Sequence, residues 1–234
     1  MLRKKIADLI RFGYGKALAD GKVDEILEKI ADLEAKGKYG DTLKLIAIGT
    51  DLASDDENTK ALKDKLRALE KSIVDKAVAE GKAQEVIDAA KQLIDSDEEI
   101  PAAELLSLLD IKGNSTEARM MRNQIYALKK EAVKKAIENG RGNELLDAIA
   151  AMNERGNSVE ALELLSYMEV KGEGEESDAL RGRLSKLKEE AIDKAFEDGR
   201  QEEILGKAKQ MISDGELPVK ACRIQSSGNL LYCF

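Results

Sequence analysis

Four glutamates that recur along the chain are the residues best suited by type and spacing to do chemistry. Each lies four residues after the glycine of a repeated segment such as "DKAFEDGR", and the four are Glu25, Glu85, Glu144 and Glu203. Acid–base catalysis by carboxylates needs at least two titratable groups held together with different pKa values. One glutamate per segment provides no such pair. The dipole of a helix stabilises a negative side chain in the first turn, so we expect these glutamates to be structural.

The sequence lacks the residues that most other catalytic and metal-binding sites use. It contains no histidine, which is the commonest general base near neutral pH and the commonest metal ligand. Its only cysteines, Cys222 and Cys233, lie close to the end of the chain. No zinc pattern and no Ser-His or Cys-His pair can be written from these residues. We therefore predict no enzymatic activity and no catalytic, cofactor-binding or metal-binding residues.

An acidic stretch, "DSDEE" at residues 95–99, resembles the start of a calcium loop because its carboxylates alternate. A calcium loop needs glycine at its sixth position and a bidentate glutamate at its twelfth. These positions are Ile100 and Leu106 here. We expect an acidic loop exposed to solvent between two helices.

A basic patch occurs once, in "LKKEAVKKAIENGR", and consists of Lys129, Lys130, Lys134 and Lys135. The corresponding segments elsewhere carry aspartate where this one has Lys134, at Asp75 and Asp193. The whole chain has 46 acidic and 38 basic residues, a formal charge of −8, which repels a phosphate backbone. We predict a salt-bridged surface at the patch and no nucleic-acid partner.

The spacing of the glycines in the repeated segments indicates a long internal repeat. They are Gly21, Gly81, Gly140 and Gly199, and their residue numbers differ by 60, 59 and 59. Apolar residues at steps of three and four precede each glycine, as at Leu62, Leu66 and Leu69, which predicts a helix of about 25 residues. A glycine just beyond a helix can adopt the left-handed conformation that ends it. Because no strand precedes the glycine, a phosphate-binding loop is disfavoured.

Two further apolar stripes follow each glycine and predict a second and a third helix. The first copy of the repeat has Ile26, Leu27, Ile30 and Leu33 in the second helix, and Leu43, Leu45, Ile46 and Ile48 in the third. Units that bury their stripes only against their neighbours stack into a solenoid. The sequence therefore predicts an all-α fold, an α-solenoid of about 59-residue three-helix repeats with one long, one medium and one short helix per unit.

The stretch "NSVEALELLSYMEVKGEGEESDAL" resembles the helix–loop–helix passages of α-solenoid helical-repeat proteins, loosely the tetratricopeptide group. That group repeats about every 34 residues with two helices, so the resemblance is one of architecture. It implies a scaffold that binds a protein or a peptide. We expect residues 1–221 to form a single helical-repeat domain with units joined near the four glycines, and residues 222–234 to be a C-terminal tail, cap or peptide.

The two ends of the chain are out of phase with the repeat, which leaves three hypotheses open. Apolar residues at either end could act as assembly or capping surfaces: Leu2, Ile6, Leu9, Phe12, Tyr14, Leu230, Leu231, Tyr232 and Phe234. Head-to-tail contacts would complete the terminal units of a homo-oligomer and give a ring or a filament. Alternatively, both ends are caps, or the last residues are a recognition peptide.

No run of apolar residues approaches the roughly 18 that a membrane-spanning helix needs. Charged residues also interrupt "MLRKKIADLIRFGYG", where a secretory signal would have a continuous apolar core. We predict a cytoplasmic protein without a membrane partner and without a cofactor.

Overall fold

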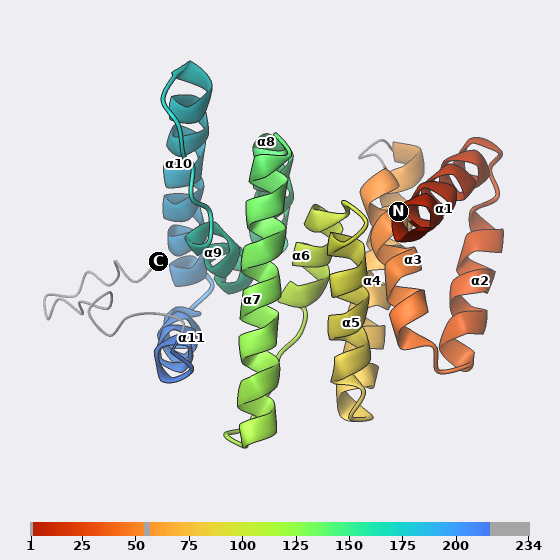
Figure 1. Cartoon of the computed structure of the whole chain (residues 1–234), viewed down its shortest axis with the longest axis horizontal. Coiled ribbons are helices and arrows are strands. Elements are labelled where there is room, and N and C mark those ends of the chain that lie inside the picture. Colours follow the sequence, from red (N-terminus) through yellow and green to blue (C-terminus); the bar gives the residue numbers. More distant parts are fainter. Residues whose placement is uncertain (1, 54–56, 216–234) are drawn as a thin grey trace, which may run out of the picture. The chain divides into compact units, whose positions relative to one another are not determined.

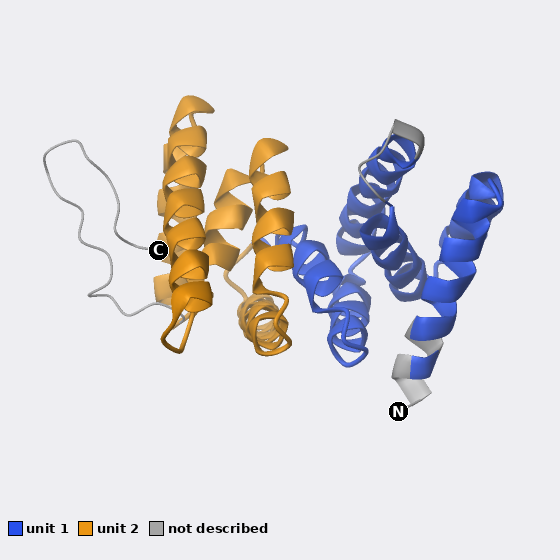
Figure 2. Ribbon diagram, turned by 90° about the horizontal axis from the view of Figure 1, so that it is seen from above, with its two compact units in different colours: residues 1–112 blue, residues 113–234 orange. Residues whose placement is uncertain are grey.

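The computed structural model describes residues 2–53 and 57–215, and this part of the chain forms eleven α-helices and no strand (Figure 1). The predicted all-α fold is therefore confirmed. The chain divides into two compact units, Met1–Lys112 and Gly113–Phe234 (Figure 2). Each unit has its own core of buried aliphatic side chains.

Unit 1 is built around its third helix. Its helices are α1 (Leu2–Ala19), α2 (Val23–Ala35), α3 (Tyr39–Leu52), α4 (Glu57–Ala79), α5 (Ala83–Ile94) and α6 (Glu99–Ser107). Helix α3 packs against each of the other five, and its Leu43 and Ile46 are fully buried. The predicted third helix is thus the centre of this unit.

Unit 2 contains α7 (Thr116–Glu138), α8 (Gly142–Glu154), α9 (Ser158–Ser166), α10 (Glu175–Glu197) and α11 (Gln201–Ser213). Helices α8 and α9 pack against each other and against both long helices, α7 and α10. The core includes Ile149, Leu162 and Leu165, all fully buried. The predicted apolar stripes of α8 and α9 therefore face this core.

Left-handed residues end the helices. Gly21, Gly81, Gly140 and Gly199 have φ values of 70°, 74°, 74° and 71°. After α1, the N–H of Lys22 donates to the carbonyl of Ala17 at 2.8 Å and the N–H of Gly21 to that of Leu18 at 3.1 Å, a Schellman arrangement. These glycines stop helices, as predicted. A second set lies sixteen residues further on, at Gly37, Asp97, Gly156 and Gly215.

The acidic stretch at residues 95–99 is only partly the solvated loop that we expected, because Asp95 and Asp97 are exposed but the two glutamates are not. Glu98 is 3% exposed and Glu99 is fully buried. The guanidinium of Arg11, on α1, donates through Nε and Nη2 to both carboxylate oxygens of Glu98, and Nη2 also donates to Asp51. Charge pairing between α1 and the start of α6 therefore keeps Glu98 inside the unit.

Helices α1 and α3 approach closely because α3 has a glycine at the contact. The ring of Tyr14 is 4% exposed and lies against Gly49. A Cβ atom added at Gly49 would lie 2.6 Å from Cε1 of Tyr14, well inside van der Waals contact. The position of α1 on unit 1 therefore depends on the absence of a side chain at residue 49.

We expect Gly49→Ala to lower the free energy of unfolding by about 1–3 kcal/mol, because the methyl group overpacks against Tyr14. The control is Gly182→Ala, an exposed glycine in the interior of α10 with open space around the added methyl. This control should gain up to about 1 kcal/mol from helix propensity. Urea unfolding of both variants measures the difference, and equal effects would contradict the close α1–α3 contact.

Candidate functional site

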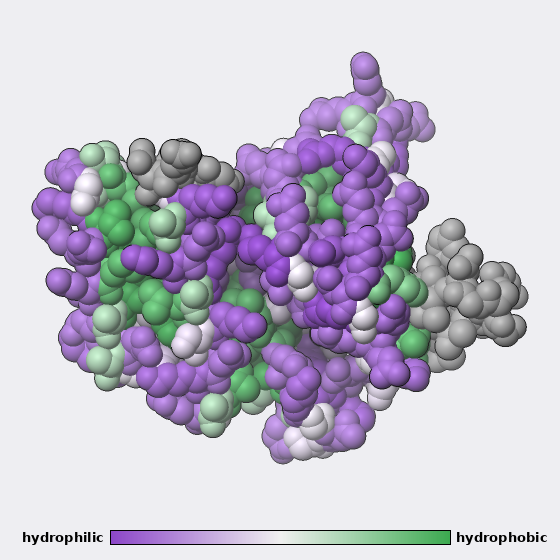
Figure 3. Space-filling model, turned by 180° about the vertical axis from the view of Figure 1, so that it is seen from behind, coloured by the Kyte–Doolittle hydropathy of each residue, from purple (hydrophilic) through white to green (hydrophobic). Residues whose placement is uncertain are grey.

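An apolar groove in unit 1 lies between α1, α2, α3 and α5, with a volume of about 370 Å³. Its apolar lining residues come from all four helices and are Ile10, Leu33, Leu45, Ile48 and Leu93. Ile48 and Leu93 are buried, whereas the first three are only partly covered. On the face drawn in Figure 3, hydrophobic residues also gather over part of unit 1 between hydrophilic ones. Incomplete coverage of apolar residues is thus a property of this unit.

The rim of the unit 1 groove is polar and carries two lysines. Lys44 Nζ lies 2.9 Å from Asp41 Oδ1 and donates to Gln92 Oε1 at 2.8 Å. Its charge is therefore paired within the rim. Lys29, on α2, is exposed beside the groove. The groove can accordingly accept apolar side chains along its floor and a carboxylate next to Lys29.

A second hollow, of about 420 Å³, lies in unit 2 beside α7 and the segment that follows α9. Its charged lining residues largely pair with one another. Lys134 lies 3.6 Å from Glu138, and the Lys130 ammonium sits 5.4 Å from the centre of the Tyr167 ring. The lining of this hollow is more polar than that of the unit 1 groove.

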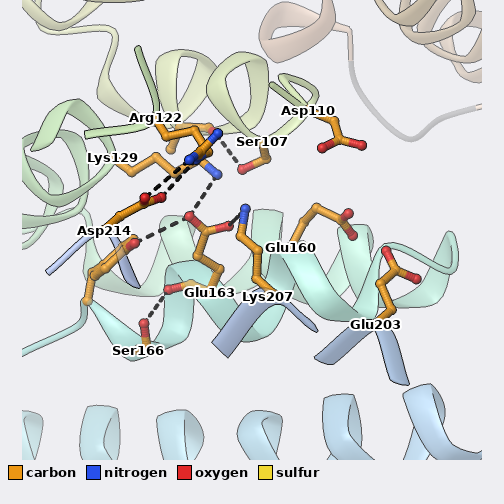
Figure 4. Close-up of polar contacts among 12 residues, drawn as sticks. Ser107, Asp110, Arg122, Lys129, Glu160, Glu163, Ser166, Glu203, Lys207 and Asp214 are labelled. Atoms are coloured by element: carbon orange, nitrogen blue, oxygen red, sulfur yellow. Dashed lines mark hydrogen bonds and ion pairs between the residues drawn. The ribbon is translucent and has the colours of Figure 1, made fainter. Parts of the chain in front are cut away.

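Unit 2 contains a buried ionic cluster, defined here as Arg122, Lys129, Glu163, Lys207 and Asp214 (Figure 4). Lys129 Nζ lies 3.0 Å from Glu163 Oε1, and Lys207 Nζ lies 3.1 Å from Glu163 Oε2. The side chains of Lys129 and Glu163 are each 1% exposed. The carboxylate of α9 thus holds one ammonium from α7 and another from α11.

The rest of the ionic cluster fixes the end of α11. Arg122 donates through Nε and Nη2 to both oxygens of Asp214, at 2.7 and 3.1 Å, and through Nη1 to the carbonyl of Gly113 at 2.8 Å. The Asp214 side chain is 1% exposed. This bidentate pair joins the first turns of α7 to the residue that follows α11.

Two opposing effects act on the pKa of Glu163. Burial of the carboxylate raises its pKa, but the ammonium groups of Lys129 and Lys207 outweigh burial and hold the pKa below its ordinary value. Burial lowers the pKa of Lys129, and Glu163 opposes this change. Perturbed groups in a cleft often mark a functional site. Lys129 and Glu163 are almost fully buried, so we interpret the cluster as a joint between helices.

The candidate assembly residues near the start of the chain divide into two groups. Leu9 is 69% exposed and Phe12 is 73% exposed, whereas Tyr14 is 4% exposed. Leu2 and Ile6 belong to α1, but their side chains lie outside the described part. The candidates at the other end, Leu230, Leu231, Tyr232 and Phe234, and both cysteines also lie outside it.

The recurring glutamates are in the first turns of α2, α5, α8 and α11, as predicted. Three of them form an ion pair with the basic residue three positions earlier: Glu144 with Arg141 and Glu203 with Arg200, both at 2.7 Å, and Glu25 with Lys22 at 3.1 Å. The basic patch is also salt-bridged, as Lys135 with Glu131 at 3.2 Å illustrates. Lys129 is the exception to the predicted surface, because its ammonium lies inside unit 2 against Glu163.

Glu163 and Lys207 were not among the residues singled out from the sequence. Glu163 lies within the apolar run "ALELL" of α9, and Lys129 follows Leu128 within the stripe of α7. A charged residue inside an apolar stripe was the available signal. It reveals burial of a charge, but it does not identify the partner on another helix.

Comparison with known proteins gave no match among protein-family models, curated proteins or solved structures. Within residues 2–53 and 57–215, no three acidic side chains are grouped so that they could hold a metal ion. None of the helices in the same part of the chain has an apolar stretch long enough to cross a membrane.

We expect Glu163→Gln to lower the free energy of unfolding by about 3–5 kcal/mol, because it leaves a buried lysine without a counter-charge. Replacing both members of the fully buried pair, as Lys129→Met with Glu163→Leu, should recover part of the loss, since the one ammonium group then left without Glu163 is that of Lys207, whose side chain is 26% exposed. Chemical denaturation of the three proteins measures both effects. A double variant no more stable than Glu163→Gln would contradict the assignment of a coupled buried pair.

The same substitution gives a pH dependence with a defined sign. The pKa of Glu163 is lowered in the folded state from its ordinary value of 4.5, so its stabilisation is complete above that pH and is lost as the pH falls further. The difference in unfolding free energy between the wild type and Glu163→Gln should therefore shrink below pH 4.5. A difference that stays constant down to the lowest pH measured would contradict this.

Proposed function

We propose that this chain is a non-enzymatic helical-repeat scaffold that binds a segment of another protein. The observation that carries the proposal is the unit 1 groove, with its apolar floor of about 370 Å³ between four helices. Grooves of this kind accept the apolar face of an amphipathic helix. Lys29 beside the groove favours a segment that carries an acidic residue next to its apolar side chains.

A repeat of about 59 residues over a single domain, residues 1–221, is part of this proposal. The three long helices α4, α7 and α10 begin at residues 57, 116 and 175 and each contain 23 residues. Both sets of left-handed residues recur with the same offset. These regularities support a stack of similar units, the architecture that helical-repeat scaffolds use to present binding surfaces.

The repeat offset relates the unit 1 groove to the buried ionic cluster of unit 2. An offset of 119 residues, from Gly21 to Gly140, aligns Ile10 with Lys129. It also aligns Lys44 with Glu163. The positions of Lys129 and Glu163, which form the buried ion pair in unit 2, are thus occupied in unit 1 by Ile10 and Lys44. Both of these residues line the groove. Ile10 is apolar, and the charge of Lys44 is paired with Asp41 at the rim.

Unit 1 has smaller side chains at two positions that belong to the ionic cluster in unit 2, and one of them, Ser96, lines the groove. An offset of 118 residues, from Gly81 to Gly199, aligns Ala89 with Lys207 and Ser96 with Asp214. The longer charged side chains fill the interior of unit 2, while the shorter ones in unit 1 make no such contacts. The space that unit 2 fills with its own side chains is thus available to a partner in unit 1.

The experiment uses two short synthetic amphipathic helices, each with leucine along one face. One carries glutamate along the other face and the second carries lysine. Calorimetry with the full chain should detect binding of the acidic peptide and weaker or no binding of the basic one. Lys29→Glu should weaken binding of the acidic peptide by about tenfold, because it replaces attraction at the rim with repulsion. Leu45→Gln should weaken the binding of both peptides, because it places a polar amide in the apolar floor of the groove.

The matched control is Lys65→Glu, an exposed lysine on α4 away from the groove, which makes the same charge change. It should leave binding unchanged. The proposal would be overturned if neither peptide bound at millimolar concentration. It would also be overturned if Lys29→Glu and Lys65→Glu had equal effects on binding. Circular dichroism of each variant verifies that the helices remain folded.

Head-to-tail assembly is the second candidate function, and the exposure of Leu9 favours it. The repeat aligns Leu9 with Leu128 and Leu187, which are 6% and 7% exposed, against 69% for Leu9. Completion of the unit by another molecule would cover Leu9. Such a contact is heterologous, so the particle mass should grow beyond two copies as the concentration rises.

A further inference from the structure

The outer face of α1 carries two exposed hydrophobic side chains that the groove and the core of unit 1 do not use. Leu9 and Phe12 are 69% and 73% exposed. Their spacing of three residues places them on one helix face, together with Lys16. Gly13, four residues after Leu9, is also exposed and has open space around the position of a Cβ atom. The face is therefore apolar at its centre, with room for another backbone to approach.

Phe12 departs from the repeat in a way that stacking does not explain. The repeat aligns it with Ser72, Glu131 and Glu190, which are polar and exposed. A phenylalanine at this position leaves a large apolar area in water unless something covers it. Head-to-tail completion would account for Leu9, whose counterparts are buried at Leu128 and Leu187 and partly buried at Leu69. It would leave Phe12 at a position that the repeat keeps in solvent.

Charged residues flank Phe12 with a two-fold arrangement. Asp8 lies four residues before Phe12 and Lys16 lies four residues after it, so they are about one helical turn away on either side. Both are exposed. An antiparallel copy of the helix centred on Phe12 would set each Asp8 opposite a Lys16. A parallel copy would set like charges against each other.

We propose that α1 is a self-association surface that pairs antiparallel with α1 of a second copy, with the two-fold axis at Phe12. The two Phe12 rings then meet at the centre, Leu9 is covered on each side, and two reciprocal Asp8–Lys16 pairs set the direction. The contact is isologous, so it closes at two copies. It does not depend on the proposed function, because neither Phe12 nor the two charged residues line the groove.

The apolar area that the α1–α1 contact buries determines how tightly the two copies should bind. Two apolar side chains per copy fall well short of the roughly 1,200 Å² that stable interfaces bury, so the dimer is weak. We expect a dissociation constant on the order of 100 µM, with the two ion pairs contributing mainly to orientation. The mass should rise from one chain of 25.6 kDa towards twice that value as the concentration increases.

Sedimentation equilibrium of the full chain over a wide concentration range tests this proposal. Phe12→Ser, which installs the residue found at position 72, should abolish the dimer. Asp8→Lys and Lys16→Asp should each weaken it by about tenfold, because each reverses two symmetric pairs. The double variant Asp8→Lys with Lys16→Asp should restore the wild-type constant to within about threefold, since it exchanges the charges without removing them.

Met120→Ser is the control for the loss of an exposed apolar side chain, because Met120 is 67% exposed on α7. It should leave dimerisation unchanged. Three results would overturn the proposal: a monomer at every concentration, growth beyond two copies, or no recovery in the charge-swapped double variant. Growth beyond two copies would instead favour head-to-tail assembly. Urea unfolding of each variant verifies that a loss of the dimer does not come from a loss of the fold.

Discussion

The apolar stripe of each helix must be covered by another helix, and this requirement determines how the helices of each unit pack. The described helices contain between 9 and 23 residues, and burial of one face against neighbouring helices supplies most of their stability. Coverage of the apolar residues is complete at α9, where Val159, Ala161, Leu162, Leu164 and Leu165 are all buried. It is incomplete on the outer face of α1 and over the unit 1 groove. The two surfaces that we propose for binding are both places where this requirement is not met.

The two units meet the same requirement with different chemistry. In unit 2 the space between α7, α9 and α11 holds Lys129, Glu163 and Lys207, whose charges compensate one another away from water. A buried ion pair adds less stability than well-packed apolar residues would, but an unmatched buried charge is costly. The cluster therefore favours one register of α11 over others. In unit 1 two interactions position α1: the close contact of Tyr14 with Gly49 and the ion pair between Arg11 and Glu98. The groove between α1, α2, α3 and α5 is left open.

Much of the fold could be predicted from the sequence, because the left-handed turn after a helix strongly favours glycine. Gly81 and Gly140 located helix ends for this reason, but Asp97 adopts the same conformation with a side chain, so the second set of turns was not recognised. Helical periodicity identifies which residues are buried on one element, but it gives no distance to another element. The pairing of Lys129 with Glu163 could not be predicted for that reason. The groove was also beyond prediction, since its lining comes from four different helices whose distances the sequence does not give.

The central claim is that the groove is open in unit 1 and that its counterpart in unit 2 is filled. Methyl NMR of the free chain with a soluble paramagnetic agent measures this directly, because relaxation reports how closely solvent reaches each methyl group. The methyls of Leu33 and Leu45 should relax strongly, while those of their repeat counterparts Met152 and Leu164, which are 4% and 1% exposed, should be protected. Equal protection of the two pairs would contradict the account.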